Sequence, residues 1–276
     1  MKDTQNPRDA LALLLRALKL PSFGKHWEEI SGKAEREGWT FGQFLHHLAE
    51  LEIAERHRRR IERLLKDSKL PLEKTSATLD RTRLPAKVQK RLPSLCDGSF
   101  LERAENILAF GLPGCGKTHL CCAIGYELIQ RGHRVLFAPT YSIVQRLLAA
   151  KRDLRLEREM RTLDAYDAVI LDDIGYVQQS REEMEVLFTF LAERYERKSV
   201  IITSNLLFSE WDRIFQNPLT TAAAIDRVVH HSVILEFGAD MRSLRADAAA
   251  ARQQADAVRG STSGAPAGPQ EARRGG

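Results

Sequence analysis

The sequence predicts an α/β fold in which a parallel five-stranded sheet is flanked by helices and preceded by a small all-helical N-terminal domain. Residues up to about 67 show helical apolar periodicity, whereas from residue 101 short apolar segments alternate with helical ones. Such alternation is typical of parallel sheets with helices on both faces. The strands are expected at 106–110, 134–138, 168–172, 199–203 and 232–236.

The N-terminal domain is expected to contain three helices. Residues 8–19 keep an apolar face, and a turn at residues 20–22 precedes a second helix that Gly38 closes. Thr40 and Gln43 form a capping-box pattern, in which each side chain satisfies the other residue's free backbone N–H. The third and longest helix should therefore begin at Thr40.

Changes in composition divide the chain into four segments. The segment before the first strand is basic, contains several prolines and has weak periodicity, so it is expected to be a linker with short structured pieces. The C-terminal tail is too polar and small-residue-rich to offset its ordering entropy, and is expected to be disordered. The expected boundaries are a helical domain at 1–67, a basic linker at 68–100, an α/β domain at 101–245 and the tail at 246–276.

Composition limits the classes of function. The formal net charge of +5 is compatible with an acidic partner such as nucleic acid. The four cysteines fit no zinc spacing and suit a reducing compartment. The adjacent histidines at 46–47 and 230–231 diverge on a helix, so neither pair can chelate one ion unaided. No signal peptide and no membrane span are predicted, so a cytoplasmic location without a membrane partner is expected.

The strongest chemical signal is a phosphate-binding loop. Residues 111–118 match G-x-x-x-x-G-K-[ST] and lie between an apolar strand and an apolar helix. Its glycines let backbone N–H groups converge on phosphate oxygens, while Lys117 reaches the β- and γ-phosphates and Thr118 coordinates Mg²⁺. The residues expected to bind the nucleotide are Gly111, Leu112, Pro113, Gly114, Cys115, Gly116, Lys117, Thr118 and His119.

Polar residues follow the third and fourth predicted strands. Because ligands gather at the carboxyl ends of parallel strands, Asp172 is expected in the Mg²⁺ shell and Asp173 is expected to polarise the attacking water. Asn205 can reach the γ-phosphate or that water. The alternatives are a turn-capping role for Asp173 and ordinary turn chemistry for Asn205. Arg227 and Arg242 are candidates to stabilise transition-state charge, although spacing alone assigns neither.

The segments GLPGCGKTHL, LDDIGY, RYERKSVIITSN, AIDRVVHH and GADMR resemble the IstB-type insertion-sequence transposition helper ATPases. These are AAA+ proteins related to the helicase loader DnaC and the initiator DnaA. The resemblance implies an ATPase domain with a P-loop AAA+ core that binds ATP and Mg²⁺. It also implies homo-oligomers with ATP at subunit interfaces, binding to duplex DNA with little sequence preference, and help to an integrase-type transposase of the same element.

The same resemblance implies roles for individual residues. Asn205 corresponds to sensor 1, Arg227 to an arginine finger offered to the neighbouring subunit's ATP, and Arg242 to the second sensor arginine. Two positions depart from the family pattern. Asp173 stands where these helpers usually carry Glu, so hydrolysis is expected to be slow and stimulated by DNA or the partner. The segment that carries Arg242 reads GADMR rather than GxSYR.

The long N-terminal helix carries a candidate DNA-binding face. Its arginines at i, i+3, i+4 and i+7 are Arg56, Arg59, Arg60 and Arg63. Such a stripe can neutralise duplex phosphates without reading bases. The alternative is a solvated helix face, because Glu52 and Glu55 precede Arg56 and Arg59 at the i,i+4 spacing of ordinary surface pairs.

Two other functions remain open. A DnaC-like replicative helicase loader would have the same catalytic core and would differ in the helical domain. A small-molecule P-loop kinase would place arginines in a lid over its acceptor. The acidic pair, Asn205 and the basic helix argue against the kinase.

Overall fold

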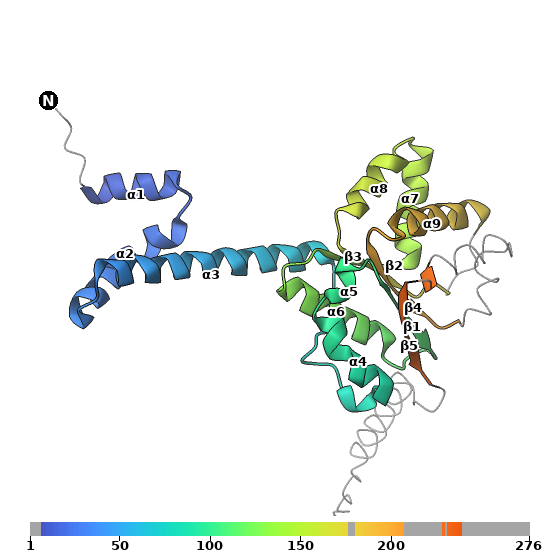
Figure 1. Ribbon diagram of the computed structural model, residues 1–276. Coiled ribbons are helices and arrows are strands. Elements are labelled where there is room, and N and C mark those ends of the chain that lie inside the picture. The colour runs from blue at the N-terminus through green and yellow to red at the C-terminus, as the bar shows by residue number, and fades with distance from the viewer. Residues whose placement is uncertain (1–6, 176–179, 207–227, 230, 239–276) are drawn as a thin grey trace, which may run out of the picture. The chain divides into compact units, whose positions relative to one another are not determined.

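The chain forms two compact units, the first ending at Ser68 and the second beginning at Lys69. The structure, a computed structural model, describes residues 7–175, 180–206, 228–229 and 231–238. The first unit contains α1 (Pro7–Ala17), α2 (Pro21–Glu37) and α3 (Phe41–Ser68) (Figure 1). Within the described ranges, no helix is both long and apolar enough to cross a membrane.

The helix ends of the first unit follow from local sequence chemistry. The Thr40 N–H donates to Gln43 Oε1 at 2.8 Å and the Gln43 N–H donates to Thr40 Oγ1 at 3.2 Å, which confirms the capping box. Gly38 closes α2 in the left-handed conformation with φ 67°. The second helix begins at Pro21, whereas a turn at residues 20–22 was expected to precede it. Proline is well tolerated at the first helical position, where its missing N–H leaves no bond unmade.

A buried carboxylate ties α3 to the start of α2 and to the turn that precedes α2. Glu52 of α3 is 3% exposed, and it accepts hydrogen bonds from the Ser22 N–H at 2.8 Å and from Arg56 Nε at 2.7 Å. Arg56 Nη2 also donates to the carbonyl oxygen of Lys19 at 2.6 Å. Burial alone would raise the pKa of Glu52, but the hydrogen bonds from Arg56 and Ser22 outweigh burial and lower that pKa.

The second unit is built on a five-stranded parallel sheet with the order β2-β3-β4-β1-β5. Its strands are β1 (Asn106–Gly111), β2 (Val135–Pro139), β3 (Ala168–Asp172), β4 (Ser199–Ser204) and β5 (Ser232–Phe237). All the predicted strands are confirmed, each with bounds within one residue of the expected ones. Because the strands are parallel, their carboxyl ends lie along one edge of the sheet.

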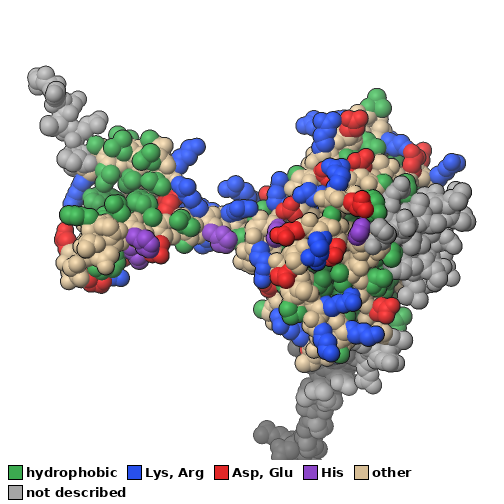
Figure 2. Space-filling model, in the orientation of Figure 1, with side chains coloured by type: hydrophobic (Ala, Val, Ile, Leu, Met, Phe, Trp, Pro, Cys, Tyr) green, Lys and Arg blue, Asp and Glu red, His purple; other side chains and the backbone are tan. Residues whose placement is uncertain are grey.

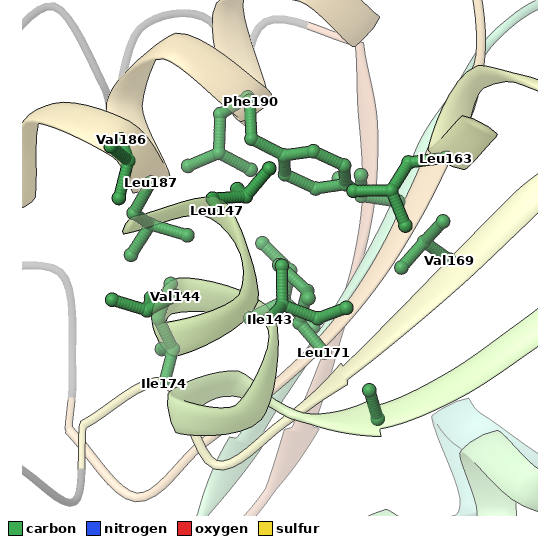
Figure 3. Close-up of a cluster of buried hydrophobic side chains, with 14 of the residues drawn as sticks. Ile143, Val144, Leu147, Leu163, Val169, Leu171, Ile174, Val186, Leu187 and Phe190 are labelled. Carbon is green, nitrogen blue, oxygen red and sulfur yellow. The ribbon is translucent and has the colours of Figure 1, made fainter. Parts of the chain in front are cut away.

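Helices cover both faces of the sheet. One side carries α7 (Thr140–Arg152), α8 (Leu156–Asp164) and α9 (Arg181–Arg194), and the other carries α4 (Ala86–Cys96), α5 (Ser99–Glu102) and α6 (Lys117–Gln130) (Figure 1). Val169 and Leu171 of β3 pack with Phe190 in the cluster beneath α7–α9 (Figure 3). Ile170 points the other way, so close to α6 that a Cβ atom added at Gly125 would lie 2.9 Å from it. The run of consecutive apolar residues in β3 is thus explained by burial on both faces.

The segment expected to link the domains belongs to the second unit instead. It contains the 3-10 helix Arg81–Arg83 and the helices α4 and α5. The buried side chains of α4 are Val88, Leu92 and Leu95. Their i, i+4, i+7 spacing forms one apolar helix face. The sequence did not predict this helix because Pro93 lies inside it, and proline is unfavourable in a helix interior. The tail predicted at 246–276 lies outside the described residues.

Candidate functional site

The loop between β1 and α6 needs glycine for steric reasons. Gly111 has φ 155°, and a Cβ atom there would lie 2.6 Å from the carbonyl oxygen of Phe237 on β5. Gly114 and Gly116 have φ 81° and 98°, a region that L side chains rarely adopt. The loop curls directly into α6, whose first turn offers free N–H groups and the positive end of the helix dipole. This arrangement is suited to binding phosphate.

The ammonium group of Lys117 is buried within this loop. The residue is 8% exposed, and Nζ donates to the carbonyl oxygens of Gly111 at 2.7 Å and Leu112 at 2.9 Å. The Sγ atom of Cys115 lies 3.8 Å from Nζ. A buried cation that donates to carbonyl dipoles attracts an anionic ligand strongly.

Asp172 is held in place by threonine hydroxyls from three elements. Thr118 Oγ1 of α6 and Thr203 Oγ1 of β4 donate to the same carboxylate oxygen, Oδ1, at 2.6 Å and 2.7 Å. Thr140 Oγ1 donates to the backbone carbonyl of Asp172 at 3.0 Å. The carboxylate and the adjacent Thr118 hydroxyl supply the hard oxygen ligands that Mg²⁺ prefers.

Asp173 leaves the strand conformation immediately after Asp172. Its φ is 59°, in the left-handed region, and its backbone N–H donates to Thr203 Oγ1 at 2.8 Å. On a continuing strand the two neighbouring side chains would point to opposite faces. The turn instead allows Asp172 and Asp173 to line one pocket of about 230 Å³.

Asn205 lines the same pocket from the end of β4. Its Oδ1 atom is buried and has no hydrogen-bond partner among the described residues. The close approach depends on Gly175, where an added Cβ atom would lie 2.7 Å from that oxygen. A buried amide oxygen without a protein donor is suited to accept a hydrogen bond from a bound water or ligand.

One wall of the pocket comes from the segment that precedes the sheet. Lys74 and His119 both line the pocket. His119 Nε2 lies 3.1 Å from the carbonyl oxygen of Thr75 and 3.1 Å from Thr78 Oγ1. Lys74, Thr75 and Thr78 could not be identified as site residues from the sequence, because no short motif marks a contact between segments so distant along the chain.

The structure brings most of the predicted site residues together. The pocket is lined by Lys74, Pro113, Gly114, Gly116, Lys117, Thr118, His119, Asp172, Asp173, Thr203 and Asn205. Gly111, Leu112 and Cys115 belong to the loop beside it. Arg227 and Arg242 lie outside the described residues. The donors fit a nucleoside triphosphate and Mg²⁺, with the loop and Lys117 for phosphates and the Thr118 and Asp172 oxygens for the cation.

The predicted DNA-binding face lies on α3 of the other unit. Its members are Arg56, Arg59, Arg60 and Arg63. The i,i+4 pairs expected of a solvated face are present, with Arg56 2.7 Å from Glu52 and Arg59 2.7 Å from Glu55. Hydrogen bonds from Arg58 and then Arg59 lower the pKa of Glu55 to about 2. The Arg56 and Arg59 side chains stay 56% and 51% exposed, so these pairs leave cationic surface on the helical unit (Figure 2).

The chain matches a known protein family over most of its length. Residues 13–250 match the family described as IstB-like ATP binding protein. The chain is 43% identical over 243 residues to the putative insertion sequence ATP-binding protein y4iQ/y4nD/y4sD of Sinorhizobium fredii (strain NBRC 101917 / NGR234), covering 87% of this chain and 82% of that protein. It is 37% identical over 235 residues to the insertion sequence IS21 putative ATP-binding protein of Pseudomonas aeruginosa, covering 85% of this chain and 89% of that protein.

Solved structures share the fold. The crystal structure of DnaI aligns with a TM-score of 0.52 and 18% identity over 62% of this chain and 95% of that one. AMPPCP-bound DnaA from Aquifex aeolicus aligns with a TM-score of 0.50 and 18% identity over 63% of this chain and 53% of that one. At these identities the likeness concerns the fold alone, and it agrees with the predicted P-loop AAA+ core.

Proposed function

Because the chain belongs to the family of IstB-like ATP-binding proteins, we propose that it is a Mg²⁺-dependent cytoplasmic ATPase that assembles on duplex DNA and assists a transposase. ATP binding follows from the family, and the solved neighbours share the fold. The observation that carries the enzymatic part is the single pocket shared by Lys117, Asp172, Asp173 and Asn205.

The loop and Lys117 are proposed to bind the β- and γ-phosphates. Lys117 Nζ would exchange its bonds to the Gly111 and Leu112 carbonyls for bonds to phosphate oxygens. Thr118 and Asp172 would hold Mg²⁺, which neutralises phosphate charge when it is bound. Their two oxygens already lie side by side, joined by a hydrogen bond of 2.6 Å.

Asp173 is proposed as the proton acceptor for hydrolysis. The attacking water forms a bond to the γ-phosphorus, its proton passes to the Asp173 carboxylate, and the bond to the β-phosphate oxygen breaks to release ADP. Asn205 Oδ1 would accept a hydrogen bond from that water and orient it. Asp173 is one methylene shorter than the usual Glu, which supports slow hydrolysis stimulated by DNA or the partner.

Arg227 and Arg242 are proposed to act at a subunit interface on the strength of the family resemblance. Arg227 would reach the ATP of a neighbouring subunit, and Arg242 would contact the ATP of its own. Neutralising charge on the transferring phosphate is the established physical role of such arginines. This arrangement requires a homo-oligomer with ATP at its interfaces.

Mixing two inactive variants tests the shared site. Lys117→Ala removes the phosphate contact and Arg227→Ala removes the finger, so each variant alone should hydrolyse ATP at less than about a tenth of the wild-type rate. In a mixture, some interfaces combine an intact loop with an intact finger, so activity should partly recover. Absence of recovery, when sizing shows that the two variants co-assemble, would contradict action between subunits.

Duplex DNA and a transposase are proposed as the partners. The proposal is supported by the net charge of +5, by the exposed arginines of α3 and by relatives named as insertion sequence ATP-binding proteins. Arg59→Gln with Arg63→Gln should weaken binding to two unrelated duplexes equally and reduce the salt slope by about 1 for each phosphate that is no longer neutralised. Arg58→Gln removes one positive charge, rather than two, from a different face of α3, and it is the control when the effects are compared per charge removed. Sequence-dependent weakening, or an equal effect of the control, would contradict a phosphate-binding face.

A DnaC-like helicase loader is the second candidate. It shares the ATP-binding core of the first candidate, so the likeness of fold to DnaI is equally compatible with both functions. Affinity capture with the intact chain separates the candidates. Recovery of a replicative helicase rather than a transposase would favour the loader.

A further inference from the structure

We infer that Thr203 is a positioning residue that sets the carboxylate of Asp173 for hydrolysis, a role that rests on the proposed ATPase function. The sequence directs attention to Asn205, two residues later, as the polar group at the end of β4. The hydrogen bonds show that the link from β4 to both aspartates runs through Thr203 instead.

The direction of each hydrogen bond at Thr203 is fixed by chemistry. The backbone amide of Asp173 can only donate, so the Thr203 hydroxyl oxygen accepts that bond at 2.8 Å. The single hydroxyl proton is then free to donate to Asp172 Oδ1 at 2.7 Å. Thr203 is 1% exposed, so no bulk water competes for these bonds. One hydroxyl therefore bridges the backbone of one aspartate and the side chain of the other.

Thr203 also holds the unusual backbone of the acidic turn. Asp173 has φ 59°, a left-handed conformation that only a few per cent of residues other than glycine adopt, although aspartate adopts it more readily than most. Its N–H bonds to the Thr203 hydroxyl, and the next amide, of Ile174, donates to the Thr203 carbonyl at 3.0 Å. Two successive amides are thus anchored on one residue of β4.

The alternative conformation would take the carboxylate away from the site. Leu171 pairs with Ile202 in the sheet, and Leu171 packs in the apolar cluster under α7–α9. If β3 continued without the turn, residue 173 would share the face of Leu171, two positions earlier. Asp173 would then point toward that cluster rather than into the pocket. The anchor at Thr203 is what makes the adjacent aspartates usable together.

The test compares substitutions that differ only in the hydroxyl group. Thr203→Ser and Thr203→Ala both lose the methyl group, and only the serine keeps the hydroxyl. Thr203→Ala should lower kcat for ATP hydrolysis by roughly 10- to 100-fold, as expected when a catalytic group is displaced by about 1 Å. Affinity for a fluorescent non-hydrolysable ATP analogue should change by less than about 3-fold, and Thr203→Ser should stay within about 3-fold of wild-type kcat.

A double-mutant cycle tests whether the effect passes through Asp173. In an Asp173→Asn background the proton acceptor is already absent, so Thr203→Ala should cause a much smaller further loss, limited to the part that acts through the hydrogen bond to Asp172. Ser199→Ala is the matched control, because it removes a buried hydroxyl from the far end of β4 that has no hydrogen-bond partner within the described part of the chain. Its kcat should equal that of the wild type.

Three results would overturn the inference. One is wild-type kcat in Thr203→Ala, and another is an equal loss in the serine and alanine variants, which would indicate packing rather than the hydroxyl. The third is an undiminished effect of Thr203→Ala in the Asp173→Asn background. Lack of hydrolysis by the wild type with DNA present would instead refute the proposed ATPase function.

Discussion

Replacing Lys117 by alanine should destabilise the protein before any nucleotide is bound. The reason is that Lys117 is 8% exposed and its ammonium group donates to two loop carbonyls, those of Gly111 and Leu112, at 2.7 Å and 2.9 Å. Alanine leaves both carbonyls without these donors. The variant therefore removes two hydrogen bonds that stabilise the folded loop, as well as a side chain that is proposed to bind phosphate.

The size of the effect follows from these two bonds. Hydrogen bonds to a charged group contribute about 1.5 kcal/mol each at the lower end of their range, which gives about 3 kcal/mol for the pair. This value is already net of the water hydrogen bonds that the ammonium group gives up on folding, so no separate desolvation cost is subtracted. The expected loss is therefore about 3 kcal/mol, or a fall in Tm of about 6–12 °C for a unit of this size.

Differential scanning calorimetry of the nucleotide-free protein measures this change. Lys151→Ala is the control, since Lys151 makes an exposed ion pair with Glu185 at 3.0 Å, and its loss should shift Tm by less than about 1 °C. A Tm for Lys117→Ala that equals the wild-type value would refute the reasoning. It would mean that the loop carbonyls find equally good partners in water.

Three further predictions concern the loop, the core and the helical unit. Gly111→Ala should abolish ATP binding in isothermal calorimetry and lower the free energy of unfolding by about 1–3 kcal/mol, because its Cβ atom would lie 2.6 Å from the Phe237 carbonyl oxygen. Normal ATP binding by this variant would contradict the steric argument. Phe190→Ala, in a side chain that is 1% exposed, should lower the free energy of unfolding in urea by about 3–5 kcal/mol, and a loss below about 1 kcal/mol would show that the cluster repacks. Arg56 and Ser22 lower the pKa of Glu52 in the folded state, so the stabilisation from this carboxylate is present above pH 4.5 and is lost as pH falls through the folded pKa. Glu52→Gln should remove that part of the acid unfolding transition, which circular dichroism can follow. An unchanged acid transition would contradict the assignment.

The strands could be predicted well, because each is a short apolar run between turn or helix signals. The burial of Ile170 against Gly125 of α6 also follows, because alternating strands and helices imply a sheet that is covered on both faces. The order in which the strands pair does not follow from the pattern, because it depends on long-range packing. The residues of α4 were missed because Pro93 disguises a helix whose apolar face is regular.

The phosphate loop could be predicted because its chemistry is local. Lys117 and Thr118 follow glycines whose spacing is fixed by the loop itself, so a short motif is enough to identify them. Thr203 could not be chosen over Asn205 from the sequence. The choice depends on the register between β3 and β4, in which Leu171 pairs with Ile202, and on the left-handed turn at Asp173. Alternation along β4 shows which of its side chains can contact the two aspartates only once that register is known.

Lys74 and the turn at Thr75–Thr78, which form one side of the pocket, determine where the chain can be truncated without losing part of the pocket. A fragment that begins at residue 101, where the strands and motifs begin, keeps the whole phosphate loop and both aspartates. It loses Lys74 from the pocket and both hydrogen-bond partners of His119. A fragment that begins at Lys69 keeps them all, so the proposed nucleotide site begins at Lys74, which lies 37 residues before Gly111 at the start of the phosphate loop.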